Sequence, residues 1–151
     1  MRLSAAAMIP LLLFLFGCSD GGDPKFVPVS GRITADGKPL ANVRVTFNPD
    51  DGDNPGPSSV GDTDSDGRFK LKVSSQRYSG NGAVPGMHRV QIGTILPGEG
   101  GKPTDPSIGS PDGEPLPGKE LIPPQFNQNT TLRFVVPKEG TDKADFDIKI
   151  K

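Results

Sequence analysis

The stretch that decides the fold covers residues 29–49 and reads VSGRITADGKPLANVRVTFNP. Apolar and polar residues alternate through its first third and again through its last third, the period-two pattern of a β-strand with one buried face. Asp36-Gly37 lies between the two runs, and both residues tolerate the positive φ of a tight turn. We therefore predict two strands joined through a turn at Asp36-Gly37, with Val43, Val45 and Phe47 facing the core.

The same alternation returns five times towards the C-terminus, near residues 60–62, over 69–73, after Pro85-Gly86, and over 130–136 and 144–150. No window after residue 18 has the three-to-four spacing of an amphipathic helix. Seven half-buried strands have to cover their apolar faces with a second sheet. The sequence therefore predicts an all-β fold, a seven-stranded antiparallel β-sandwich. Its core should contain Phe47, Phe69, Val90, Phe134 and Phe146.

Residues 1–18 have the composition of an export signal. Arg2 precedes an apolar run that is shorter than the ~20 residues of a membrane-spanning helix. The run ends at Gly17-Cys18, and Cys18 is the only cysteine of the chain. This ending resembles the lipobox of bacterial lipoproteins, which implies a diacylglyceryl group on Cys18. The alternative is a plain secretory signal with an incidental cysteine.

With the lipobox, the predicted protein is extracytoplasmic and held by its lipid at a bacterial membrane, in the cell envelope. Residues 19–26 then form a polar spacer, and residues 27–151 form the folded domain. The formal net charge is −1, so there is no basic footprint for nucleic acid, and membrane contact is expected through the lipid. No cysteine remains for a disulfide.

A long insertion interrupts the predicted strands over about residues 96–124. It is rich in proline and glycine and has no strand alternation. A segment of this length is either functional or disordered. Two interpretations stay open, a partner-binding proline-rich segment and a flexible surface loop.

Several motifs in series resemble one family. They are VSGRI at 29–33, DGKPL at 36–40, VTF at 45–47, TDSDGRF at 63–69, AVPGMHRV at 83–90, IPPQFN at 122–127 and DFDI at 145–148. In this order they resemble the carboxypeptidase regulatory-like, or transthyretin-like, domains of small bacterial lipoproteins. The resemblance runs from about residue 27 to residue 150 and is interrupted by the proline-rich insertion. It implies a prealbumin-like sandwich that serves as an accessory or interaction module, without catalytic residues.

Asp62, Asp64 and Asp66, followed by Gly67, match the first half of an EF-hand calcium loop. The bidentate glutamate of such a loop is replaced by Val73, so the pattern is incomplete. The carboxylates of residues 50–53 could complete a site if their loop folded over it. The other interpretation is a solvated Asp/Gly turn between two strands. These three aspartates are weak calcium candidates, and we expect no metal otherwise.

Other chemistry is sparse. His88, the only histidine, shares a predicted strand face with Val90 and Ile92, and we expect it to be structural, at the sheet boundary. One histidine does not make a zinc site, which needs three or four ligands. An activated nucleophile would need His88 as its base, and the chain has no nucleophile-elbow sequence. Intradiol-type dioxygenases need two tyrosines and two histidines, and transthyretin-like ureide hydrolases need several histidines, so residue counts exclude both. We predict no catalytic residue, no cofactor and no enzymatic activity.

Three aromatic residues lie outside the signal and the predicted core, namely Phe26, Tyr78 and Phe126. A carbohydrate site built on aromatic platforms therefore has little support. The expected function is an accessory or interaction module with an unknown protein or glycan partner. The alternative is an extracytoplasmic protein that binds calcium, a glycan or a peptide.

Overall fold

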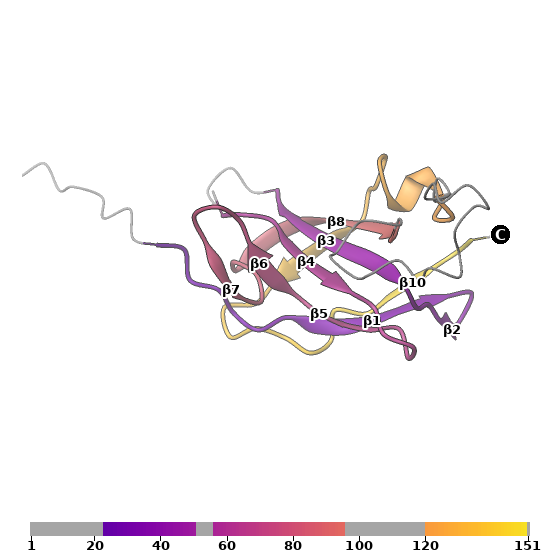
Figure 1. The fold of residues 1–151 in the computed structure, drawn as a ribbon, viewed down its shortest axis with the longest axis horizontal. Helices are drawn as coiled ribbons and strands as arrows, with labels where there is room; N and C mark the ends of the chain where they lie inside the picture. The colour runs from indigo at the N-terminus through magenta and orange to yellow at the C-terminus, as the bar shows by residue number, and fades with distance from the viewer. Residues whose placement is uncertain (1–22, 51–55, 96–119, 151) are drawn as a thin grey trace, which may run out of the picture.

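The structure is a computed structural model that describes residues 23–50, 56–95 and 120–150. Two β-sheets pack face to face (Figure 1). The larger sheet has the strand order β7-β6-β4-β3-β8-β9, and in the smaller sheet β1 lies between β10 on one side and β2 and β5 on the other. The predicted all-β sandwich is thereby confirmed. In chain order the strands are β1 (Ser30–Ala35), β2 (Lys38–Pro39), β3 (Val43–Pro49), β4 (Ser59–Asp62), β5 (Arg68–Lys70), β6 (Lys72–Ser74), β7 (Ser79–Asn81), β8 (Gly86–Thr94), β9 (Arg133–Val136) and β10 (Phe146–Ile148).

Within the described residues the one helix is the short 3-10 helix η3 (Pro124–Phe126). Accordingly, this part of the chain contains no helix long and apolar enough to cross a membrane.

The first turn forms as predicted, but the two predicted strands, β1 and β3, do not pair with each other. Asp36 and Gly37 have φ values of 50° and 80°, and β1 turns back into β2, which is only two residues long. Asn42, with φ of 57°, then directs the chain away. As a result β3 joins the other sheet, because alternation fixes which face of a strand is buried and leaves its partner open.

The carboxylate of Asp147 holds this first turn. Its Oδ1 atom accepts hydrogen bonds from the Thr34 hydroxyl at 2.7 Å and the Gly37 amide at 2.9 Å. These bonds and the one from Lys149 lower the pKa of Asp147 to about 2. The last strand therefore fastens the first turn through a side chain as well as through the backbone.

The pairing between β1 and β10 is the parallel exception in a mainly antiparallel structure, with Ile33 opposite Phe146 and Ala35 opposite Ile148. The chain leaves β9 in the larger sheet, turns at Gly140 (φ 84°), and enters the smaller sheet through a parallel bridge between Val29 and Thr141. It therefore arrives at the end where β1 begins. A strand that starts there has to run in the same direction as β1.

The predicted strand over 69–73 is divided between the two sheets. β5 pairs with β1, whereas β6 pairs with β4 and β7. At the division, the Leu71 amide donates to the Val29 carbonyl at 2.9 Å, and the Gly82 amide donates to the Leu71 carbonyl at 2.8 Å. One continuous segment thus links the two layers, and its three apolar side chains all remain buried.

Phe47 is the centre of the core. It is fully buried, and its ring lies 5.7–6.3 Å, centroid to centroid, from the rings of Phe69, His88, Phe134 and Phe146. These rings come from β5, β8, β9 and β10, so both sheets contribute. Phe69 and Val90 are buried as predicted, and Phe134 and Phe146 are half-buried against the same cluster. The predicted inward faces are therefore correct.

The predicted insertion at 96–124 extends too far at its C-terminal end. Ile122 is only 3% exposed and belongs to the core, and Phe126 packs against it. Two adjacent apolar residues followed by two prolines show no alternation by which Ile122 could be recognised as a core position. Residues 96–119 of the insertion lie outside the described residues.

Replacing Phe47 by alanine should lower the free energy of unfolding by about 3–5 kcal/mol, because the truncation leaves a cavity among four rings. The control is Leu121→Ala, at a side chain that is 64% exposed, which should change stability by less than about 0.5 kcal/mol. Urea denaturation measures both. Equal losses in the two variants would contradict the central position of Phe47.

Candidate functional site

The outer face of the six-stranded sheet carries a group of polar side chains that bind one another. Every second side chain of β3 and β8 is buried in the core, so the alternate side chains lie on the outer face of the sheet. Along β3 these are Arg44, Thr46 and Asn48, and along β8 they include Arg89 and Gln91. The register places Thr46 opposite Gln91 and Asn48 opposite Arg89. Polar side chains thus lie in cross-strand pairs on this face.

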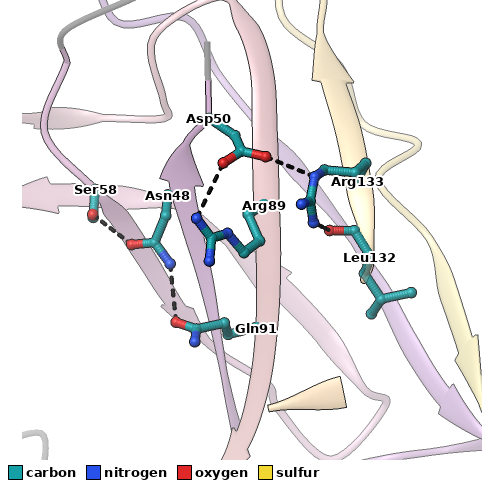
Figure 2. Close-up of polar contacts among 7 residues, drawn as sticks. All are labelled: Asn48, Asp50, Ser58, Arg89, Gln91, Leu132 and Arg133. Atoms are coloured by element: carbon teal, nitrogen blue, oxygen red, sulfur yellow. Dashed lines mark hydrogen bonds and ion pairs between the residues drawn. The ribbon is translucent and has the colours of Figure 1, made fainter. Parts of the chain in front are cut away.

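One carboxylate joins two arginines at the β8–β9 side of this face (Figure 2). Asp50, directly after β3, accepts from Nη2 of Arg89 at 3.1 Å and from Nε of Arg133 at 2.7 Å. Arg89 and Arg133 are themselves opposite each other in the β8–β9 ladder. Exposed ion pairs contribute little to stability. The consequence of this arrangement is positional, because it fixes two guanidinium groups side by side.

A second hydrogen-bonded group, built around amide side chains, lies beside the first on the same face. The Ser58 hydroxyl donates to Oδ1 of Asn48 at 2.6 Å, and Nδ2 of Asn48 donates to Oε1 of Gln91 at 2.9 Å (Figure 2). Nε2 of Gln91 then donates to the Asn127 carbonyl at 3.3 Å. Together with the pairs around Asp50, these residues make up what we call the polar lattice, which comprises Asn48, Asp50, Ser58, Arg89, Gln91 and Arg133.

Glu120 fastens the segment after the insertion to the end of β8. Its carboxylate accepts hydrogen bonds from the amide and hydroxyl of Thr94, from the Ile122 amide at 2.7 Å and from Nδ2 of Asn127 at 2.7 Å. Partial burial raises the pKa of Glu120, but the hydrogen bonds outweigh that effect and hold the pKa below its usual value. Glu120 is therefore ionised and structural, and it brings Asn127 next to β8.

A small recess lies beside the polar lattice. Its volume is about 220 Å³, and Gly93 leaves room in it for the Asn127 amide, because a Cβ at Gly93 would lie only 3.1 Å from Nδ2 of Asn127. The lining combines one cation, one carboxylate, two amides and two hydroxyls. Its residues are Arg44, Thr46, Gln91, Gly93, Thr94, Glu120 and Asn127.

Two of the three aspartates considered for calcium, Asp62 and Asp64, bind other groups through their carboxylates. Asp62 binds Arg44 through both carboxylate oxygens, at 2.9 and 3.3 Å. Oδ1 of Asp64 accepts the amides of Asp66 and Arg68, both at 2.9 Å, which is the geometry of a capped turn. Residues 23–50, 56–95 and 120–150 contain no group of three metal-ligating side chains. The Asp62–Gly67 segment thus has the arrangement of a turn; residues 51–53 lie outside the described part.

His88 lies in the core, deeper than the sheet boundary expected from the sequence. It is fully buried, and its Nδ1 lies 3.0 Å from the Gly86 carbonyl, to which it can donate. Within the described residues its Nε2 has no hydrogen-bond partner. Burial lowers the pKa of His88, and the hydrogen bond to Gly86 opposes this only in part. The neutral form is therefore the native one.

The three aromatic residues outside the predicted core do not form a common platform. Phe126 packs against the core next to η3. Phe26 and Tyr78 pack on each other, with ring centroids 6.4 Å apart. Cys18, the predicted lipidation site, lies outside the described residues.

Sequence reasoning missed Glu120, Asn127 and the polar lattice. The first two belong to the stretch taken for the end of the insertion or for a family motif. In the sequence, the lattice residues of β3 and β8 appear only as the polar positions of two alternating strands. Which of them lie opposite each other depends on the strand register, which the alternation does not determine.

Residues 29–95, from just before β1 to just after β8, match the model of a protein family described as a domain of unknown function (DUF6795). Comparison with curated proteins and with solved structures found no significant match.

Replacing His88 by phenylalanine should stabilise the protein most strongly at mildly acidic pH. The folded-state pKa of His88 lies below the unfolded value of about 6.5, so the unfolded chain takes up a proton that the native state resists. The wild type therefore keeps this stability above about pH 6.5 and loses it as the pH falls towards the lowered pKa. Phenylalanine also removes a buried unpaired nitrogen that costs about 1–3 kcal/mol.

Melting temperatures at neutral pH and near pH 5 measure both effects. Because His88 is the only histidine, the variant should have a flatter profile over this interval. An unchanged pH profile would show that His88 titrates normally in the folded protein.

Proposed function

We propose that this protein is a non-catalytic lipoprotein of the bacterial cell envelope, anchored by a lipid on Cys18. Its β-sandwich, which resembles carboxypeptidase regulatory-like domains, acts as an accessory or interaction module. The outer face of the six-stranded sheet is the surface that meets the partner, an envelope protein or glycan.

The observation that carries this proposal is the polar lattice. Its side chains hold one another in place through bonds of 2.6–3.1 Å. Side chains that are already ordered lose less entropy when a partner binds. Two guanidinium groups fixed side by side also present planar donors, and arginine is enriched at protein interfaces. A surface of this kind favours recognition of an acceptor-rich partner.

Support for the anchor comes from the sequence alone. The apolar run of residues 1–18 ends in Gly17-Cys18, and the polar spacer of residues 19–26 lies between it and the β-sandwich. Anchoring by several acyl chains is firm, whereas a single chain holds a protein only marginally.

A second candidate function, glycan binding, is favoured by the recess next to the lattice. Amides, hydroxyls and a carboxylate line its volume of about 220 Å³, and these groups can donate to and accept from sugar hydroxyls. Calcium binding has less support, because Asp62 and Asp64 already have partners. This alternative is tested by titrating envelope oligosaccharides into wild type and into Gln91→Ala and measuring the heat of binding by calorimetry.

Replacing Cys18 by serine should move the protein from the membrane fraction to the soluble fraction. The reason is that serine cannot take the thioether-linked diacylglyceryl group. Cell fractionation and labelling with a fatty-acid analogue measure the result. A Cys18→Ser protein that stays in the membrane fraction to the same extent as wild type would contradict lipid anchoring.

Replacing Arg89 and Arg133 together by alanine should abolish capture of the partner from detergent-solubilised envelope. Both arginines are exposed, so the melting temperature should change little. The charge-matched control replaces Lys38 and Lys70, on the smaller sheet, by alanine. Quantitative mass spectrometry of the captured proteins compares the variants with wild type. Loss of the same protein from both variants would show that the lattice is not the interaction surface.

A further inference from the structure

Two aromatic side chains pack together outside the core, at the end of the sandwich where the described chain begins. The rings of Phe26 and Tyr78 meet edge to face, with centroids 6.4 Å apart and an interplanar angle of 69°. Phe26 also covers Gly80, where a Cβ would lie 2.8 Å from Cδ2 of the ring. Both residues are half-buried, and neither belongs to the core cluster. These rings therefore keep part of their surface towards solvent.

Each ring has a cation next to it in sequence. The guanidinium carbon of Arg77 lies 5.4 Å from the centroid of the Tyr78 ring. Lys25 precedes Phe26 and is exposed. Neither cation forms an ion pair with any carboxylate of the described residues. Asp23, also exposed, is the nearest acidic residue along the chain. We call Lys25, Phe26, Arg77 and Tyr78 the N-terminal aromatic surface.

Backbone hydrogen bonds hold the two halves of this surface together. Val27 and Ala83 exchange a pair of bonds at 2.9 and 3.0 Å, which fixes the N-terminal segment beside the connection from β7 to β8. The turn before β7 is closed by a bond from the Ser75 amide to the Tyr78 carbonyl and by a bond from the Tyr78 amide to the Ser75 hydroxyl. The positions of the rings are thus set by the fold.

The chain leaves the sandwich at this end. In Figure 1 the indigo N-terminal segment departs beside β7, whereas β2 and η3 lie towards the opposite end. Lys25 is seven residues after Cys18, and a backbone of that length spans at most about 25 Å. An anchor on Cys18 therefore keeps the N-terminal aromatic surface within that distance of the lipid.

We propose that the N-terminal aromatic surface rests in the headgroup region of the bilayer that holds the anchor. This inference depends on the proposed lipidation of Cys18. Tyrosine is enriched at membrane–water interfaces, where the ring is apolar and its hydroxyl stays hydrated. Lysine and arginine close to a bilayer are attracted to anionic headgroups. The contact orients the sandwich, with β7 towards the membrane and η3 away from it.

Fluorescence can locate this surface because the chain contains no tryptophan. Tyr78→Trp places a single reporter in the surface, and Leu121→Trp, at a side chain that is 64% exposed near η3, is the matched control. The lipidated full-length variants are reconstituted in vesicles of phosphatidylcholine and phosphatidylglycerol in equal parts, with brominated acyl chains. We expect Tyr78→Trp to be quenched severalfold more than Leu121→Trp. Phe26→Trp serves as a second reporter and should behave like Tyr78→Trp.

The outcomes separate the two proposals. If the proteins float with the vesicles but Tyr78→Trp and Phe26→Trp are quenched no more than Leu121→Trp, the anchor stands and the membrane-facing surface is overturned. If they do not float, the anchor itself fails and this inference fails with it. In the Tyr78→Trp background, Lys25→Glu should reduce quenching, whereas Lys38→Glu, at the other end of the sandwich, should leave it unchanged. Equal effects of the two charge reversals would also overturn the proposal.

Discussion

The contact of Phe47 with four aromatic rings is the interaction on which the rest of the structure depends. Phe47 projects from the middle of the larger sheet and reaches rings from β5 and β10 in the smaller sheet as well as from β8 and β9 in its own. The inward faces of five strands meet at this side chain, and its contacts join the two layers. The buried His88 belongs to the same cluster, which explains why a histidine is kept neutral there.

Strand faces could be predicted from the sequence, and strand partners could not. Alternation identified the inward side chains of β3, β5, β6, β8 and β9, because side-chain direction is a local property of an extended chain. The placement of β1 and β3 in different sheets depends on Asn42, and the division at Leu71 depends on hydrogen bonds to Val29 and Gly82. Such long-range contacts leave no periodic trace in the sequence.

The candidate site shows the same limit. Asp62 was considered as a metal ligand from its spacing to Asp64 and Asp66, but the register puts it opposite Arg44, with which it pairs. Asp50 was considered as an accessory ligand and instead joins two arginines from other strands. Both outcomes depend on which cation the neighbouring strand presents. Cross-strand neighbours decide the role of an exposed carboxylate, and only the register identifies them.

The position of β1 has a mechanical consequence. It is the first strand after the N-terminal segment, and it is bonded on both sides, to β10 along one edge and to β5 and β2 along the other. A pull on the N-terminus acts along the axis of β1, across hydrogen bonds that lie at a steep angle to the strand. Those bonds therefore carry the load together, in shear, instead of opening one after another. The placement of β1 between its neighbours would therefore resist unfolding under a force that the proposed lipid anchor transmits to the N-terminus.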